Sequence, residues 1–376
     1  MQPVALCYRY GREFTLKLSR LVVFLICVSL VFGTSTLTVN AEEGAPTSPT
    51  TRIDAYLSHL TATGAFSGSV LVSKNGDILF SKGYGLADRE NGVSNTPQTR
   101  YILASVSKQF IAMSILILQK QHKLSVRDHV CAHIPDCPRA WKDITLHHLL
   151  THTSGIQDYM SFNDFGAQMG YPHNPTELIG WFRNKPLWFA PGTGWRYSNS
   201  GYALLGYVIE QVSAESLAQF LRENIFDPLQ MNDSGYDPDN AIGTDLAVGY
   251  DDAERSDYMD MSVAYAPGGL YASIEDLGRW SNALDANTLL PARMEKLLFK
   301  AYVRTAGASA ESYGYGWFIR KRLNRAVVEH AGVLAGFSTL ITRFQKEHIT
   351  IIILANQYVN TDAIGNEISR LVVVDK

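Results

Sequence analysis

The chain has 376 residues, of which 46% are hydrophobic and 18% are charged. This balance excludes an intrinsically disordered chain, because disordered segments combine low hydrophobicity with high net charge. The 33 Lys and Arg residues against 36 Asp and Glu leave a formal charge of -3, so no nucleic-acid partner is predicted. Four cysteines are too few for a small disulfide scaffold. The length suffices for two or three lobes with an ample core.

The N-terminus is predicted to be a secretory signal peptide. A basic segment precedes the apolar run Leu21–Phe32, which is too short to span about 30 Å of hydrocarbon comfortably. The step Val39-Asn40-Ala41 offers the small residue that a signal peptidase favours, so residues 1–41 are expected to be removed. An uncleaved N-terminal anchor is the alternative. Both interpretations place the rest of the chain in the periplasm or outside the cell, with no membrane-spanning segment after signal cleavage.

The mature chain is predicted to begin with a linker and a β-hairpin. Residues 42–51 are rich in Pro, Thr and Ser, as linkers are. Phe66–Val72 and Asp77–Ser81 are predicted strands, and Asn75-Gly76 between them is a strong signal for a hairpin turn.

The middle of the chain is predicted to be helical and the C-terminal part to return to strands. Ser105–Gln119 is apolar nearly all round, which is typical of a helix buried on several sides. The other predicted helices are Thr145–His152, Thr176–Asn184, Ser200–Val212, Ser216–Asn224, one that begins with a capping box at Ser273, and Thr361–Val373. The other predicted strands are Tyr315–Arg320, Ala326–His330, Phe337–Arg343 and Ile349–Ala355.

Strands at both ends of the chain predict an α/β (α+β) fold. Its antiparallel sheet would combine N- and C-terminal strands, flanked by helices, with a mostly helical lobe inserted between them. Residues 52–104 and 261–376 are assigned to the sheet lobe and residues 105–260 to the helical lobe. A cleft between the two lobes is the expected ligand site.

Ser105 and Lys108 form the only S-x-x-K pair in the chain. Three residues apart at the first turn of a helix, their side chains project from one face. Burial lowers the pKa of a lysine, so that its neutral amine can take a proton from a serine hydroxyl. A capping serine followed by a solvated lysine is the simpler interpretation, but the apolar helix behind the pair favours a desolvated lysine.

Two further motifs offer polar groups for the same chemistry. In Tyr197-Ser198-Asn199, a tyrosine beside a cation can share proton transfer and an amide can hold a substrate carbonyl, although Asn199 is also a candidate helix cap. In the second, His330 is followed two residues later by Gly332, which would let a substrate lie against the strand edge. A backbone N–H there would join that of Ser105 in an oxyanion hole.

The order S-x-x-K, Y-x-N, H-x-G resembles the penicillin-recognising serine hydrolases, a family of class C β-lactamases, D-alanyl-D-alanine carboxypeptidases and related esterases. The resemblance covers nearly all of residues 52–373 and includes the stretches LHHLLTHTSGI, PGTGWRYSNSGYALLGYVIE and PGGLYASIEDLGRW. It implies acylation of the serine, proton transfer by the lysine and tyrosine, and a third motif that lines the oxyanion strand. These roles are carried to Ser105, Lys108, Tyr197, Asn199 and His330, with Val333 as the second backbone donor.

Departures from the family pattern narrow the expected substrate. The third motif is not the Lys-Thr-Gly of class C β-lactamases, so an efficient β-lactamase is not expected. Histidine there resembles the carboxypeptidase and D-amino-acid peptidase or amidase branches, whereas esterase branches often have Trp. Neither Ala331 nor Val333 has the hydroxyl with which relatives hold a terminal carboxylate. Arg320 or Arg322 is a candidate replacement for that anchor, although charged strand residues are usually only solvated.

Other polar features are not expected to take part in the reaction. His148 and His152 are four residues apart, but without an H-E-x-x-H motif they are predicted to be structural, and no metal is expected. The acidic segment 251–260 is predicted to be a solvated loop, with calcium binding as the alternative. Cys131 and Cys137 form either a small-loop disulfide or two free thiols.

The sequence therefore predicts an exported serine hydrolase that needs no cofactor and forms an acyl-enzyme on Ser105. Its expected partners are small molecules or short peptides, among them peptidoglycan fragments and β-lactams. A D-alanyl-peptide carboxypeptidase or amidase is the first hypothesis, a carboxylesterase with weak or no β-lactamase activity the second, and a catalytically inactive ligand-binding protein the third. Either Lys108 or Tyr197 is the general base.

Overall fold

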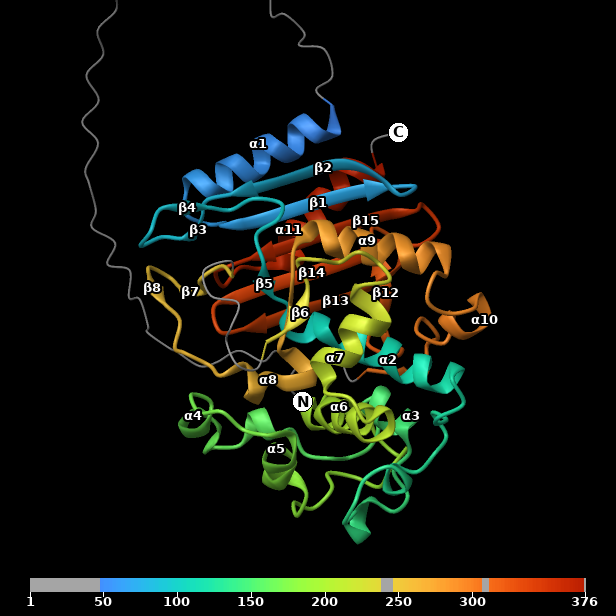
Figure 1. The fold of residues 1–376 in the computed structure, drawn as a ribbon. Coiled ribbons are helices and arrows are strands. Elements are labelled where there is room, and N and C mark those ends of the chain that lie inside the picture. Colours follow the sequence, from blue (N-terminus) through green and yellow to red (C-terminus); the bar gives the residue numbers. More distant parts are fainter. Residues whose placement is uncertain (1–47, 238–245, 306–310, 375–376) are drawn as a thin grey trace, which may run out of the picture.

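The computed structural model describes residues 48–237, 246–305 and 311–374 (Figure 1). The predicted signal peptide and most of the predicted linker lie outside these residues. One large sheet joins the N-terminal hairpin to the C-terminal strands, and all of its neighbouring strands are antiparallel. Its strands, in spatial order, are β10 (Val303–Arg304), β11 (Ser312–Tyr313), β12 (Phe318–Arg322), β13 (Arg325–Leu334), β14 (Phe337–Phe344), β15 (Ile349–Ala355), β1 (Gly68–Lys74) and β2 (Asp77–Tyr84). The predicted architecture is confirmed.

The remaining elements are helices and short strands. The α-helices are α1 (Pro49–Ala62), α2 (Lys108–Lys120), α3 (Leu146–Leu150), α4 (Phe165–Gln168), α5 (Pro175–Phe182), α6 (Asn199–Ser213), α7 (Leu217–Leu221), α8 (Met261–Gly268), α9 (Ile274–Ala286), α10 (Ala292–Glu295) and α11 (Thr361–Ser369). A 3-10 helix, η1 (Ala104–Ser107), precedes α2, and π-helical turns follow α7 and α11. The small strands are β3 (Leu86–Asp88), β4 (Val93–Ser94), β5 (Tyr101–Ile102), β6 (Gly235–Tyr236), β7 (Tyr250–Asp251), β8 (Glu254–Arg255) and β9 (Leu270–Ala272).

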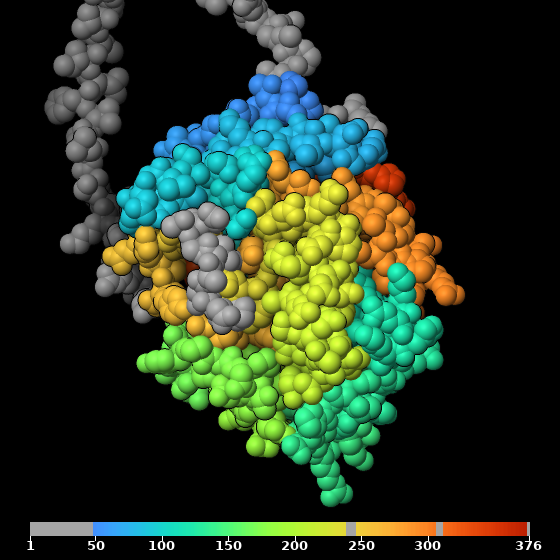
Figure 2. Space-filling model, viewed as in Figure 1, coloured from blue at the N-terminus to red at the C-terminus, as the bar shows by residue number. Residues whose placement is uncertain are grey.

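The large sheet is covered on both faces, so alternate residues of its central strands belong to different cores. On β15, Ile351 and Ile353 pack with α1 and α11, whereas Ile352 and Leu354 pack with the helices of the opposite face. Figure 2 shows the green to yellow middle of the chain as a continuous half of the molecule below the blue and cyan N-terminal segment. The helical part and the sheet therefore meet along one face of the sheet.

Several boundaries differ from the prediction. Helix α1, which was not predicted, begins inside the predicted linker, so that prediction is wrong for residues 49–51; Ser48 caps the helix by accepting a hydrogen bond from Thr51 N. The H-x-G motif lies inside β13 rather than at a strand end. The predicted capping box of α9 is half formed: Ser273 accepts from Asp276 N, but the Asp276 carboxylate binds other groups.

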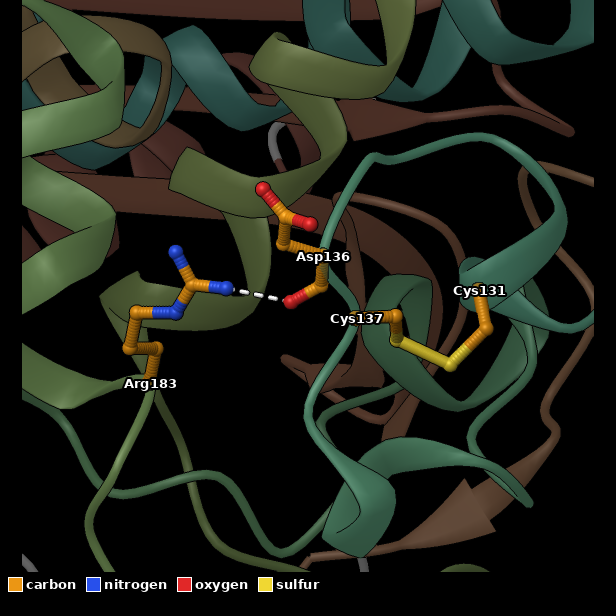
Figure 3. Close-up of a disulfide and its surroundings, with 4 residues drawn as sticks. All are labelled: Cys131, Asp136, Cys137 and Arg183. Carbon is orange, nitrogen blue, oxygen red and sulfur yellow. Dashed lines mark hydrogen bonds between the residues drawn. A yellow bond between two sulfur atoms is a disulfide. The ribbon is translucent and has the colours of Figure 1, made fainter.

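A disulfide joins Cys131 and Cys137 in the loop between α2 and α3 (Figure 3). The carbonyl of Asp136, inside this loop, accepts a hydrogen bond from the Arg183 guanidinium just beyond α5. Of the two alternatives for these cysteines, the structure has the disulfide. No helix within the described ranges has the length and apolar character needed to cross a bilayer.

Candidate active site

Ser105 lies in η1, directly before the buried helix α2. Two neighbouring sheets hold this turn: Leu103 N donates to Leu270 O at 2.7 Å, and Thr339 Oγ1 donates to Leu103 O at 2.8 Å. Ala104 has a positive φ of 48°, which a non-glycine residue adopts only where its surroundings enforce it. The fold therefore fixes the backbone immediately before the predicted nucleophile.

Lys108, the first residue of α2, is completely buried beside this serine. Its Nζ lies 3.1 Å from Ser105 Oγ, 2.8 Å from Asn199 Oδ1 and 2.9 Å from Pro267 O. Burial lowers the pKa of Lys108 to about 7, against an opposing effect of the Asp158 carboxylate. At neutral pH a substantial share of Lys108 is therefore a neutral amine, within reach of the serine proton.

Tyr197 packs over the same amine, with its ring centroid 4.9 Å from Lys108 Nζ. On its other side its ring lies against His152, at a centroid distance of 4.3 Å, and His152 Nδ1 accepts a hydrogen bond from Ser198 N. Burial raises the pKa of Tyr197 well above its usual value, although Ser105 acts in the opposite direction. Tyr197 is therefore a neutral phenol at physiological pH, and His152 has the structural role predicted for it as a support for this ring.

Asn199 points at Lys108 rather than capping α6. The cap residue is Ser198, and Asn199 is the first residue of the helix. Its amide is held by a carboxylate that the sequence analysis did not single out: Asp158, which is buried, accepts hydrogen bonds from Asn199 N at 3.0 Å and Nδ2 at 3.3 Å. The interpretation of Asn199 as a cap is wrong, and Asp158 joins the site.

His330 faces the same cluster from β13, and the structure determines its tautomer. Its Nδ1 lies 2.7 Å from the carbonyl oxygen of Ala331, which can only accept, so Nδ1 carries the proton. Nε2 then accepts from the Tyr313 hydroxyl at 3.0 Å. Burial and the nearby Lys108 charge lower the pKa of His330 to about 3. His330 is therefore neutral across the physiological range and is not a proton acceptor poised near pH 7.

Gly332 allows β13 to approach the nucleophile closely. A Cβ atom at this position would lie 2.8 Å from Ser105 N and 2.5 Å from Leu103 O, closer than real Cβ contacts. Val333, the next residue, is 62% exposed. Along β13, the partner strand β12 pairs only as far as Glu329, so the described strands leave one edge open from His330 onwards. The geometry is compatible with the predicted role of the Ser105 and Val333 backbone N–H groups.

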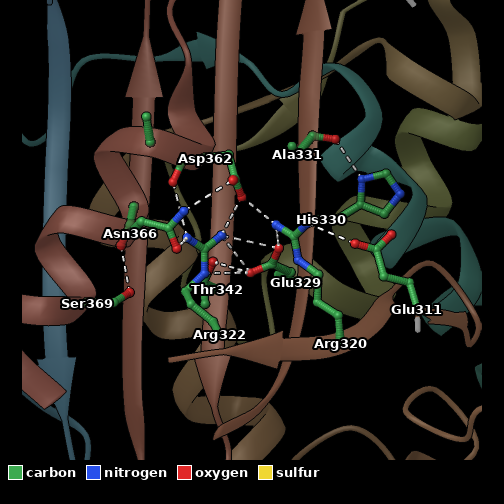
Figure 4. A network of polar contacts seen from close by, with 12 residues as sticks. Glu311, Arg320, Arg322, Glu329, His330, Ala331, Thr342, Asp362, Asn366 and Ser369 are labelled. Carbon is green, nitrogen blue, oxygen red and sulfur yellow. Dashed lines mark hydrogen bonds and ion pairs between the residues drawn. The ribbon is translucent and has the colours of Figure 1, made fainter. Parts of the chain in front are cut away.

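The predicted carboxylate anchor is wrong, because both arginines are used on the other face of the sheet. Arg322 is buried and binds Glu329, Asp362 and Asn366, and Arg320 also pairs with Glu329 and Asp362 (Figure 4). Figure 4 shows this network beside α11, whereas the ring of His330 points away from it. Neither guanidinium is available to a substrate at Ser105.

The described residues contain no group of three or more His, Cys, Asp or Glu side chains that could hold a metal ion. His148 instead caps α3, where its Nδ1 accepts a hydrogen bond from Thr145 N. The acidic segment 251–260 is not a simple loop: part of it forms the β7–β8 hairpin, and the buried Asp260 caps α8 by accepting from Ser262 N.

The arrangement of serine, buried lysine, tyrosine and asparagine can be compared with known proteins. A model of the family described as Beta-lactamase matches residues 53–374. The chain belongs to the β-lactamase family. Within it, the chain is 31% identical over 318 residues to the putative penicillin-binding protein PbpX of Bacillus subtilis, a match that covers 84% of this chain and 75% of that relative.

Solved structures of this family are similar in fold. The octameric penicillin-binding protein homologue from Pyrococcus abyssi has a TM-score of 0.77 at 27% identity, covering 86% of this chain and 77% of that one. The D-amino acid amidase from Ochrobactrum anthropi SV3, complexed with L-phenylalanine, has a TM-score of 0.77 at 20% identity, covering 86% and 98%. At this identity, the likeness to the amidase shows the fold alone.

Proposed function

We propose that the protein is an exported serine hydrolase that forms an acyl-enzyme on Ser105 and cleaves small amides, with D-alanyl peptides or D-amino acid amides as the first substrate class. One observation supports it above all: Lys108 lies 3.1 Å from Ser105 Oγ and has a pKa of about 7. Such an amine is basic enough to take the serine proton, and at pH 7 about half of it is neutral and able to do so. A structural lysine has no need of this placement.

The proposed reaction follows from these contacts. Neutral Lys108 takes the proton of Ser105 Oγ as the oxygen attacks the substrate carbonyl carbon. The developing oxyanion lies between the backbone N–H groups of Ser105 and Val333. As the C–N bond breaks, the leaving amine takes a proton, for which Tyr197 is the relay, and water then hydrolyses the ester on Ser105. Lys108 is favoured over Tyr197 as the base, because burial raises the phenol pKa well above neutrality.

The D-amino acid part of the proposal has support from relatives. The chain resembles penicillin-binding proteins in sequence and a D-amino acid amidase in fold. The neutral His330 lines the third motif, where the sequence resembles the peptidase and amidase branches. Arg320 and Arg322 bind carboxylates of the protein itself, so D-amino acid amides, which have no free terminal carboxylate, stand beside D-alanyl peptides in the proposed substrate class.

A carboxylesterase is the second candidate, and the use of Arg320 and Arg322 by the protein's own carboxylates favours it. The loss of Arg320 and Arg322 as anchors removes the sequence argument for a free terminal carboxylate on the substrate. Simple esters need no such anchor, and the alcohol of an ester is a better leaving group than the amine of an amide. The esterase hypothesis therefore differs from the amidase hypothesis only in the leaving group.

Export is proposed from the N-terminal signal predicted by the sequence and from the Cys131–Cys137 disulfide. Disulfides persist in oxidising compartments and are rare in the cytosol. A periplasmic or secreted location agrees with substrates of cell-wall type. Fractionation of the producing cells, followed by detection of the protein with and without reducing agent, tests this part.

The test of the function is covalent trapping. The purified protein is incubated with a fluorescent penicillin, nitrocefin, p-nitrophenyl acetate, D-amino acid amides and D-alanyl-D-alanine peptides, and intact mass is followed by peptide mapping. We expect an adduct on Ser105 and turnover of amides or esters, both absent in Ser105→Ala, whose fold is unchanged by circular dichroism. Residual turnover in Ser105→Ala above about one part in a thousand would exclude the covalent route. No adduct and no turnover with any probe would leave a ligand-binding protein.

A further inference from the structure

Asp158 is a buried carboxylate with an unusual set of partners. It lies in the loop after α3 and is 5% exposed, and within the described part of the chain its side chain forms no ion pair. Its oxygens instead accept from neutral N–H groups: Oδ1 from Asn199 N, Oδ2 from Asn199 Nδ2, and the carboxylate also from the backbone N–H of Met160. A buried ionised carboxylate that is held only by neutral donors is costly, which makes a purely structural role a poor explanation.

The consequence for Asn199 is a fixed orientation of its amide. An ionised carboxylate can only accept hydrogen bonds, so the Nδ2 group must face Asp158. The Oδ1 atom must then face the other way, where it accepts from Lys108 Nζ at 2.8 Å. With the amide reversed, an NH₂ group would face the lysine amine, which would lose one of its three partners.

The charge of Asp158 also acts on the amine. Lys108 is surrounded by Tyr197 and Tyr202, with ring centroids 4.9 and 5.6 Å from Nζ, and by His152 and His330. Burial keeps both phenols protonated and both imidazoles neutral. Burial raises the pKa of Asp158, and the hydrogen bonds from Asn199 and the charge of Lys108 oppose this rise. The ionised Asp158 adds a negative charge to these neutral surroundings, and a negative charge favours the ammonium form of Lys108.

We propose that Asp158 is a positioning residue for the reaction at Ser105: its carboxylate holds the Asn199 amide with Oδ1 toward Lys108, and its charge keeps that amine from losing its proton too readily. The inference rests on the proposed function, in which neutral Lys108 takes the proton of Ser105. Asp158 touches neither the nucleophile nor the amine, so it acts through Asn199 and through space.

The experiment compares Asp158→Asn with Asp276→Asn. Asp276 is a suitable control, because it is also buried and accepts from Asp233 N and Ser234 Oγ, although it pairs with Arg279 as well, and because it lies on α9 away from the site. For Asp158→Asn we expect the acid limb of kcat/KM to move to lower pH and the plateau kcat to fall about 10- to 100-fold. Asp276→Asn should lower the melting temperature without moving the pH profile. Equal pH profiles in wild type and Asp158→Asn would overturn the proposal.

A second measurement needs no turnover. In protein labelled with ¹³C at lysine Cε, the resonance absent from Lys108→Arg reports the titration of Lys108. We expect its pKa to fall in Asp158→Asn and to stay at the wild-type value in Asp276→Asn; no change in Asp158→Asn would refute the charge effect. If Asp158→Asn does not fold, carboxyl ¹³C spectra of the wild type decide, since a protonated Asp158 at neutral pH would also refute it. A wild type that turns over no substrate contradicts the proposed function, but leaves the NMR result to decide the role of Asp158.

Discussion

The two faces of β13 carry two buried polar clusters of opposite character. Glu329 and His330 are adjacent in sequence and point to opposite sides of the sheet (Figure 4). On the α11 side, the guanidinium of Arg322 meets the carboxylates of Glu329 and Asp362. On the Ser105 side, the amine of Lys108 meets only oxygens of neutral groups.

The difference shows how the two sides of one strand can face a permanent charge and a conditional one, since Lys108 lies on α2 opposite β13. A guanidinium paired with carboxylates stays charged, so the cluster of Arg322, Glu329 and Asp362, here called the α11 cluster, contributes to stability but cannot exchange a proton near neutral pH. An amine that is desolvated without a direct counter-ion gains and loses its proton near neutral pH, as Lys108 does with a pKa of about 7. The first cluster is suited to holding the strand, and the second to moving a proton.

The largest expected effect comes from removing the amine. Lys108→Met should reduce acylation of Ser105 at least about 1,000-fold, because the serine loses its base. Its melting temperature should stay the same or rise, since a desolvated amine is replaced by an apolar chain of similar length. Stopped-flow measurement with a chromogenic ester, together with calorimetry, checks both. A variant that is inactive and also much less stable would mean that Lys108 has a structural task.

The second-largest effect is expected for Gly332→Ala, which should lower kcat/KM about 100-fold. The added Cβ would meet Ser105 N and Leu103 O, so β13 must move away from the backbone that carries the nucleophile. Gly180→Ala is a suitable control, because a Cβ there meets nothing within 4 Å. Activity close to that of the wild type would show that β13 does not form part of the oxyanion site.

The pH dependence separates the amine from the imidazole. Below about pH 7 the rate of acylation should fall tenfold per pH unit, because only neutral Lys108 accepts the proton and its pKa is about 7. His330 cannot cause this limb, since its pKa of about 3 keeps it neutral throughout. Rates with an ester substrate across the stable pH range test the assignment. A limb that persists near pH 6.5 in an active Lys108 variant would assign it to another group.

The central part of this site could be predicted from the sequence. The order of Ser105, Tyr197 and His330 along the chain, together with the apolar helix after the serine, indicated a desolvated lysine next to a nucleophile. The hairpin turn and the apolar C-terminal strands likewise indicated a sheet built from both ends of the chain. These features depend on local patterns, which can be recognised in the sequence without knowing the tertiary contacts.

The remainder depends on contacts between distant segments. Asp158 and Asn199 are 41 residues apart, and only the packing of the α3 loop against the start of α6 gives the carboxylate its partner. An acid within the otherwise uncharged stretch THTSGIQDY was the one available signal. The arginines were misassigned because the sequence did not show the register between β12 and β13, and hence which face they share with Glu329.

The smallest expected effect on activity comes from the α11 cluster. Arg322→Met should lower the free energy of unfolding by about 3 kcal/mol, because it leaves the buried Glu329 with fewer partners. Arg320 still reaches Glu329, so the loss should lie at the lower end for buried pairs. Activity per folded molecule should change less than about twofold. As a comparison, Arg325→Met, at a half-exposed pair with Glu347, should lower the free energy of unfolding by at most about 1 kcal/mol. Denaturant unfolding and active-site titration measure both quantities. If Arg322→Met lost activity while keeping its stability, the two faces of β13 would be coupled. The α11 cluster would then not be separate from the reaction at Lys108 and Ser105.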